Sequence, residues 1–535
     1  MPVTASATPA ASVIPEEVVA TITSLADAAV SEHRTAGLVW AVVGGHDQDS
    51  AVLASGASGS RRLEGGRPAP GSAPMDRGTI SRIASMTKSF TAAGVLRLRE
   101  EGRLRLDDPI AQHVPEAAAL SPATADSPVI TVRDLLSMSA GLVTDNPWGD
   151  RQESMTREQF AAMIAKGLGH VHAPGTGFEY SNTGFALLGR LIDEVTGLPY
   201  DQYLTETFLV PLGMHDTSFS REHLDASRIA TGHRLADRVD ATRFEAVDFD
   251  EPGVYGAMAG LFSTVDDIAT WVRFLAAADA PDAPGREQGL LSTASRREMQ
   301  QIHRIQSTPA LPAGQDGASP GFANVRGYGF GLVVERFPEL GDVISHSGGY
   351  PGYGSFMVWH RDSGVGVVVL ANSKYAPATP VAMSVLRTLD DQVPGLLAAR
   401  LPSAAPRTLE AARAALDWLR EGDDTLADVW FADNMDLDIS REERRRRLAS
   451  ALERSGVSAA DLDALTPQDA DVLSRASVRW TLRGRADDDS GTGTGSGSGS
   501  GSGGTLHITL LMDPRADALI QSLDTVATAP AASGS

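Results

Sequence analysis

The chain has 535 residues, 42% of them hydrophobic and 21% charged, a balance typical of folded proteins, and it is long enough to predict two or three domains. A net charge of −22 leaves no basic excess for neutralising phosphates, which argues against a nucleic-acid or anionic-membrane partner. The absence of cysteine excludes disulfides, zinc–thiolate sites, iron–sulfur clusters and a cysteine nucleophile.

The N-terminal segment gives an expectation about the compartment. Residues 1–15 contain no Lys or Arg and no apolar run of the ~7–15 residues that a secretion signal requires. No part of the chain approaches the ~20 consecutive apolar residues of a membrane span. We therefore expect a soluble cytoplasmic protein.

The first half of the chain is expected to be mostly helical after an initial hairpin. Pro15, followed by two glutamates, is typical of a helix start. Two apolar runs, Leu38–Val43 and Ala51–Ala54, flank a polar turn and predict a hairpin. Hydrophobic spacing predicts further helices at Ser85–Glu101, Val132–Met138, Gly184–Thr196, Pro199–Phe208 and Val265–Ala277.

Strands return late in this part of the sequence. Short runs rich in β-branched and aromatic residues predict strands at Tyr328–Glu335, Val343–His346, Gly354–Trp359 and Val365–Leu370, before a helix at about Pro380–Asp391. Because strands open and close this unit, we expect an α+β fold. Its antiparallel sheet would be built from both ends of the unit, flanked by helices, and interrupted by an all-helical insertion.

A second, smaller α+β unit is expected at the C-terminus. Its predicted elements are two helices and then a pair of strands, at Leu409–Arg420, Arg441–Arg454, Ser477–Arg485 and Thr505–Met512. The basic run Arg444–Arg447 is interpreted as a solvated helix face. The expected boundaries are a flexible N-terminus at 1–14, a main domain at 15–395, a linker at 396–406 and a C-terminal domain at 407–535, with a disordered Gly/Ser loop at 490–504.

Ser85-Met86-Thr87-Lys88 is the main chemical feature of the sequence. Positions three apart on a helix share one face, so Lys88 can take the proton whose loss makes a serine hydroxyl a nucleophile. That requires the lysine pKa to fall by about 3 units, which burial can cause. The same spacing also arises when a capping serine precedes a surface lysine, so the motif alone does not decide.

Two further motifs bear on the same chemistry. In Tyr180-Ser181-Asn182, a phenol beside the lysine can relay a proton and an amide can hold a substrate carbonyl. In His346-Ser347-Gly348-Gly349, the glycines let a substrate approach closely, and a backbone N–H can form an oxyanion hole with that of Ser85. Taken singly, each motif also fits an ordinary turn or a glycine-rich hairpin end.

The order of the three motifs resembles that of the serine β-lactamase-like superfamily, which includes class C β-lactamases, D,D-peptidases and esterases. The resemblance covers about residues 15–395. Four supporting segments match it as well: Glu101–Pro109, Ile130–Leu136, Ala259–Thr264 and Tyr328–Leu332. It implies a penicillin-binding-protein-like serine hydrolase with the β-lactamase/transpeptidase fold.

The resemblance also implies roles for individual residues. Ser85 would form an acyl-enzyme, and Lys88, alone or with Tyr180, would accept its proton. Tyr180 would protonate the leaving group and activate the deacylating water. The residues that would bind substrate or the oxyanion are Asn182, His346, Gly348 and Gly349. Asn182 could instead orient Lys88.

The chain departs from the family pattern in two places. His346-Ser347-Gly348 stands where β-lactamases usually carry Lys-Thr-Gly, so a fixed positive charge is missing. We expect His346 to be partly protonated near pH 7 and β-lactam hydrolysis to be inefficient. Ser137–Leu142 replaces a common His-Thr-Ser-Gly-Leu motif and is expected to have a structural role.

Three functions fit these observations. The first is hydrolysis of small esters or amides, the second is a D-aminopeptidase or D,D-carboxypeptidase, and the third is a binding protein that keeps the fold without turnover. The expected partner is a small ester, amide or peptide. Since no metal-ligand pattern and no phosphate-binding loop is recognisable, we expect no metal and no organic cofactor. The sequence does not set the oligomeric state.

Overall fold

The computed structural model describes residues 14–237, 242–280, 289–306, 325–374, 376–400, 402–484 and 504–529. The chain divides into two compact units, Met1–Ala399 and Arg400–Ser535. The expected flexible N-terminus, apart from Ile14, lies outside the described residues, and so does the Gly/Ser tract apart from Gly504.

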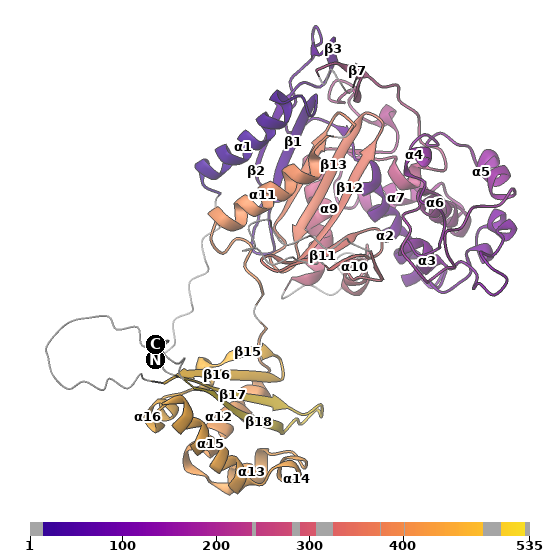
Figure 1. Ribbon diagram of the computed structural model, residues 1–535. Helices are drawn as coiled ribbons and strands as arrows, with labels where there is room; N and C mark the ends of the chain where they lie inside the picture. Colours follow the sequence, from indigo (N-terminus) through magenta and orange to yellow (C-terminus); the bar gives the residue numbers. More distant parts are fainter. Residues whose placement is uncertain are drawn as a thin grey trace. The chain divides into compact units, whose positions relative to one another are not determined.

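An eight-stranded antiparallel sheet forms the centre of the first unit (Figure 1), in the order β2-β1-β14-β13-β12-β11-β10-β9. Its first two strands come from the start of the unit and the other six from its end, which confirms the predicted α+β architecture. The strands are β1 (Gly37–Val43), β2 (Val52–Gly59), β9 (Arg304–Ile305), β10 (Val325–Tyr328), β11 (Val333–Phe337), β12 (Gly341–Tyr350), β13 (Tyr353–His360) and β14 (Gly366–Ala371).

Helices cover both faces of this sheet. α1 (Glu16–Ser31) and α11 (Ala378–Gln392) pack on one face, and α9 (Val265–Ala276) packs on the other (Figure 1). In β1, Trp40 belongs to the hydrophobic cluster of α1 and α11, whereas its neighbour Ala41 belongs to the cluster of α9. Burial on both faces explains why β1 is a continuous apolar run rather than an alternating one.

The mainly helical region lies between β2 and the late strands. α2 (Thr87–Glu100) passes through its middle, and every residue from Thr87 to Leu96 is buried. The other helices are α3 (Val132–Leu136), α4 (Asn146–Gly149), α5 (Arg157–Ile164), α6 (Asn182–Thr196), α7 (Tyr200–Leu204), α8 (Gly256–Ala259) and α10 (Thr293–Met299). Short strand pairs also lie in this part of the chain: β3 (Leu63–Glu64) with β4 (Arg67–Pro68), β5 (Ser81–Arg82) with β8 (Phe262–Ser263), and β6 (His233–Leu235) with β7 (Phe244–Ala246).

One strand prediction in this unit was wrong. Tyr328–Glu335 was expected to be a single strand, but β10 ends at Tyr328 and β11 begins at Val333. Gly331 has a φ of +70°, a left-handed conformation that turns the chain. A Cβ at Gly331 would lie 2.7 Å from the carbonyl oxygen of Lys88, so the turn packs directly on α2.

The second unit combines helices with a four-stranded antiparallel sheet in the order β15-β16-β17-β18. The sequence predicted the central pair but missed both outer strands. The elements are α12 (Pro406–Glu421), α13 (Asp424–Trp430), α14 (Met435–Asp438), α15 (Arg441–Ser455), α16 (Ala459–Asp463), β15 (Asp471–Ser474), β16 (Ser477–Arg483), β17 (Thr505–Met512) and β18 (Ile520–Thr528).

The basic run Arg444–Arg447 on α15 was expected to be a solvated helix face, but part of it is buried. Arg444 is buried and donates hydrogen bonds to the carbonyl oxygens of Met435, at 2.9 Å, and Leu523, at 3.3 Å. α15 packs on β18, and Arg444 lies on the packed side, whereas Arg446 and Arg447 are exposed.

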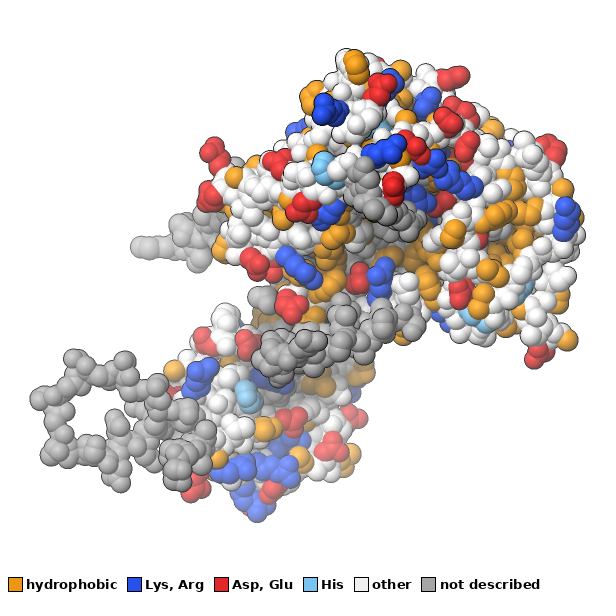
Figure 2. Space-filling view, turned by 45° about the horizontal axis from the view of Figure 1, so that its top comes forward, with side chains coloured by type: hydrophobic (Ala, Val, Ile, Leu, Met, Phe, Trp, Pro, Cys, Tyr) orange, Lys and Arg blue, Asp and Glu red, His pale blue; other side chains and the backbone are white. Residues whose placement is uncertain are grey.

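On the larger unit, Figure 2 shows acidic and basic side chains interspersed on the visible face.

No helix in the described ranges is long and apolar enough to cross a membrane.

Replacing Gly331 with alanine should destabilise the first unit more than replacing Gly102. Gly102 has a similar φ of +72°, but an added Cβ would meet no atom within 4 Å, so it is the matched control. We expect Gly102→Ala to cost about 1 kcal/mol of unfolding free energy through backbone strain, and Gly331→Ala about 1–3 kcal/mol more through overpacking. Urea denaturation measures both, and equal losses would contradict the close packing on α2.

Candidate active site

Ser85 lies in a single 3-10 turn, Ala84–Met86, directly before α2. The preceding residue, Ala84, has a φ of +48°, a left-handed conformation that is strained for a residue with a Cβ. Two hydrogen bonds hold this turn at Ile83. The Ile83 N–H donates to Leu261 O at 2.9 Å, and the Ser355 hydroxyl donates to Ile83 O at 2.7 Å. Strain held in place by surrounding structure is common at functional sites.

The Lys88 amine is completely buried behind Ser85 and has three close acceptors. Nζ lies 2.9 Å from Ser85 Oγ, 2.8 Å from Asn182 Oδ1 and 3.1 Å from Met258 O. Of these three acceptors, only the Ser85 hydroxyl can also donate. When Lys88 is neutral, its two N–H groups can stay on Asn182 and Met258 while its lone pair accepts the Ser85 proton.

The pKa of Lys88 is lowered from its ordinary value to about 7. Burial is the main cause, because it disfavours the charged ammonium. The carboxylates of Asp145, Asp150 and Glu153 oppose this shift. A pKa near 7 makes Lys88 a base at neutral pH, which an exposed lysine is not.

Asp145 positions the start of α6 and therefore Asn182. Its carboxylate accepts hydrogen bonds from the backbone N–H of Asn182 at 2.6 Å and of Thr183 at 2.9 Å. The Asn182 side chain donates from Nδ2 to Asn146 Oδ1 at 3.0 Å, which leaves Oδ1 to face Lys88. A carboxylate at a helix N-terminus is electrostatically favourable. No motif in the sequence pointed to Asp145.

Tyr180 brings its hydroxyl group to the nucleophile. That hydroxyl is hydrogen-bonded to Ser85, and its ring centre lies 5.0 Å from Lys88 Nζ. Burial raises the pKa of Tyr180 well above its usual value, so the phenol keeps its proton at neutral pH. The loop at Ser137–Leu142 holds the Tyr180 turn, because Met138 O accepts the Glu179 N–H at 2.9 Å.

His346 is buried and neutral, so the expected partial protonation near pH 7 was wrong. Burial, followed by the nearby charge of Lys88, lowers the pKa of His346 to about 3. Nδ1 lies 2.7 Å from Ser347 O, a group that only accepts, so Nδ1 carries the proton. The Tyr328 hydroxyl, 3.0 Å from Nε2, then donates to that nitrogen.

The glycines of β12 allow a close approach to the nucleophile turn. A Cβ at Gly348 would lie 2.2 Å from Ile83 O and 2.1 Å from Ser355 Oγ, so only glycine fits there. A Cβ at Gly349 would meet no atom within 4 Å. β11 pairs with β12 only as far as Ser345, and the strand edge beyond that residue is therefore not covered by β11.

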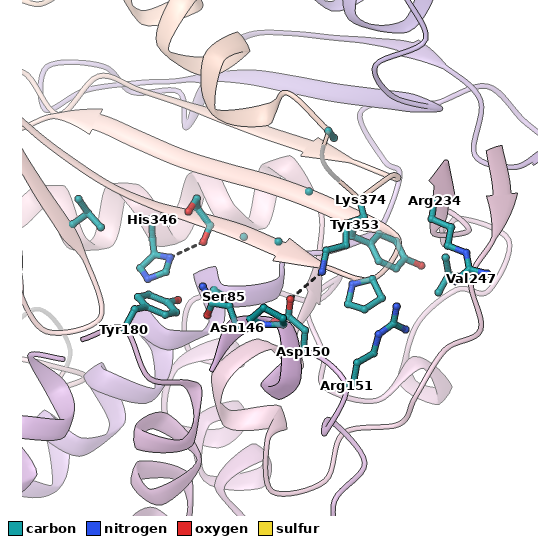
Figure 3. Close-up of a pocket in the computed structure, with 18 of the residues that line it drawn as sticks. Ser85, Asn146, Asp150, Arg151, Tyr180, Arg234, Val247, His346, Tyr353 and Lys374 are labelled. Carbon is teal, nitrogen blue, oxygen red and sulfur yellow. Dashed lines mark hydrogen bonds and ion pairs between the residues drawn. The ribbon is translucent and has the colours of Figure 1, made fainter. Parts of the chain in front are cut away.

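A cavity of about 840 Å³ opens over Ser85 (Figure 3). Five of the seven predicted site residues line it, and Lys88 and Asn182 lie behind Ser85 instead. The sequence singled out neither Asp150 nor Lys374, whose side chains form an ion pair of 3.0 Å at the cavity wall. In the part of the chain that the structure describes, no group of three or more His, Asp or Glu side chains is arranged to hold a metal ion.

This fold and this arrangement of serine, lysine and tyrosine define a β-lactamase-type serine hydrolase. The family model described as Beta-lactamase matches residues 22–390, more than half of the chain, so the chain belongs to the beta-lactamase family of enzymes.

Three proteins illustrate what the chain is similar to. Protein flp of Staphylococcus aureus (strain COL) is 29% identical over 304 residues, which cover 56% of this chain and 54% of flp, so the match spans about half of that relative. The D-amino acid amidase of Ochrobactrum anthropi SV3 has a TM-score of 0.54 and 25% identity, covering 70% of this chain and 99% of the amidase. The octameric penicillin-binding protein homologue of Pyrococcus abyssi has a TM-score of 0.57 and 20% identity, covering 95% of this chain and all of that one, and supports the fold alone.

Substituting Lys88 with methionine should stabilise the protein at neutral pH. The unfolded state binds a proton on Lys88 below its ordinary pKa of 10.5, and the folded state binds it only below about 7. Burying Lys88 therefore lowers the free energy of unfolding, by an amount that grows as the pH falls from 10.5 to 7 and is on the order of 4 kcal/mol at pH 7. Lys88→Met removes this destabilisation but leaves the Asn182 and Met258 oxygens without their hydrogen-bond donor, which offsets part of the gain.

The measurement is thermal unfolding of Lys88→Met and wild type at pH 7 and pH 10. We expect a higher Tm for the variant at pH 7 and a smaller difference at pH 10. The exposed lysine Lys166, changed to methionine, is the control and should show neither effect. A stability difference that does not change with pH would contradict a depressed Lys88 pKa.

Proposed function

We propose that the protein hydrolyses small esters or amides through an acyl-enzyme on Ser85. The observation that carries this proposal is the fully buried Lys88 amine, 2.9 Å from Ser85 Oγ and with a pKa of about 7. A serine hydroxyl needs such a base to attack a carbonyl carbon.

Acylation begins with neutral Lys88. Ser85 Oγ bonds to the substrate carbonyl carbon while its proton passes to Lys88 Nζ. The carbonyl oxygen becomes an oxyanion, for which the backbone N–H groups of Ser85 and Gly349 are the proposed donors. Losing one such donor typically reduces the rate by about 10²–10³.

Tyr180 completes the proton transfers. Its protonated phenol donates to the leaving oxygen or nitrogen as the bond to the carbonyl carbon breaks. The Lys88 ammonium then returns a proton to Tyr180 and becomes neutral again. Deacylation follows the same course with water in place of Ser85 as the nucleophile. General acid–base steps of this kind typically contribute about 10²–10⁴ in rate.

A D-aminopeptidase or D,D-carboxypeptidase activity is the second candidate. The similarity to the D-amino acid amidase favours it. Efficient β-lactam hydrolysis is not expected, because neutral His346 offers no fixed charge for the carboxylate of a β-lactam.

A fluorophosphonate probe should label Ser85 covalently. Intact-protein mass spectrometry should show one adduct on the wild type and none on Ser85→Ala, since only an activated serine reacts. Lys88→Met should lose labelling while keeping the fold, and Lys166→Met should keep both. Labelling of Ser85→Ala would place the nucleophile elsewhere. No adduct on the wild type would favour a binding protein without turnover.

A further inference from the structure

The cavity extends to two chemically different sides of Ser85. Figure 3 shows Tyr180 and His346 on one side, and Asp150, Arg151 and Lys374 on the other. On the proposed mechanism the leaving group takes its proton from Tyr180 and therefore lies on the Tyr180 side. The acyl part of the substrate must then occupy the opposite side, which we name the acyl end.

The acyl end has more positive than negative side chains. Lys374 is paired with Asp150 at 3.0 Å, and Arg234 is paired with Glu245. Arg151 also lines the cavity, and within the described ranges its side chain has neither an ion pair nor a hydrogen bond. Among the described residues that line this end, Arg151, Arg234 and Lys374 are cationic and Asp150 is anionic, and Arg151 is the cation without an ion pair.

Apolar side chains line the cavity beside these charged groups. Leu235, Val247, Pro351 and Tyr353 line this part of the cavity, and Figure 3 places Val247 and Tyr353 next to Arg234. A short hydrocarbon chain suits such walls, and an anionic group at its far end suits an arginine, whose planar fork binds carboxylates bidentately.

We propose that the acyl end binds an acyl group that ends in a carboxylate, as in a half-ester or half-amide of a dicarboxylic acid, with Arg151 determining this specificity. The proposal rests on the proposed Ser85 acyl-enzyme chemistry.

A substrate with a free ammonium group at this position fits less well. The only carboxylate beside Ser85 at this end, among the described residues, is that of Asp150, and Lys374 already neutralises it. An ammonium would have to displace Lys374 and would then lie near the positive charge of Arg151. Like charges at close range repel each other.

The test compares two 4-nitrophenyl esters of equal chain length, the mono-ester of adipic acid and the hexanoate. For the wild type, kcat/KM should be higher for the adipate, and Arg151→Gln should lower the adipate-to-hexanoate ratio by about tenfold, the effect of one ion pair of about 1.4 kcal/mol. The loss should lie mainly in KM, since the carboxylate contact is made equally in the ground and transition states.

Arg151→Glu should reverse the preference, and Arg105→Gln, at an exposed arginine outside the cavity, should leave it unchanged. An unchanged adipate-to-hexanoate ratio in Arg151→Gln would overturn the acyl-end proposal and leave the Ser85 chemistry intact. So would a wild type with a higher kcat/KM for D-alanyl 4-nitroanilide than for adipoyl 4-nitroanilide. Turnover of neither ester, with no acylation of Ser85, would instead overturn the proposed function.

Discussion

The buried amine of Lys88 is the constraint on which the rest of the site depends. An ammonium group is costly to remove from water, and the fold meets that cost by letting the pKa fall to about 7 rather than by pairing the amine directly with a carboxylate. Asn182 and Met258 hold two of its hydrogen-bonding directions, and Ser85 occupies the third. The same buried surroundings that make Lys88 a base therefore also orient its amine towards Ser85 Oγ, and they reduce the free energy of unfolding.

A second buried charge connects the segments that carry the site. Arg82, three residues before Ser85, forms an ion pair of 2.7 Å with Glu153, and both side chains are fully buried. The Arg82 guanidinium also lies 3.9 Å from the ring centre of Tyr350, at the end of β12. Buried pairs contribute little net stability, but removing one partner leaves an uncompensated charge, which typically costs about 3–5 kcal/mol. Arg82 therefore contacts both Glu153 and the end of β12 from its position just before the nucleophile turn.

The sequence predicted the features that depend on the spacing of neighbouring residues. It missed those that depend on contacts between distant parts of the chain. Ser85 and Lys88 share a helix face by spacing alone, but the neutral state of His346 follows from burial under Tyr328, which lies 18 residues away along the chain. β18 was missed because a bulge interrupts its pairing with β17. Ile520 and Leu523 are both buried although they are three positions apart, which breaks the two-residue period expected of a strand.

The pKa of Lys88 tests this account most directly. The chain contains only three lysines, at positions 88, 166 and 374, so lysine labelled with ¹³C at Cε gives few NMR signals, and the signal missing from Lys88→Met is assigned to Lys88. Titration of the wild type should show this signal changing with a midpoint near pH 7. A Lys88 signal that remains that of an ammonium up to pH 9 would contradict the account, because Ser85 would then have no neutral base beside it.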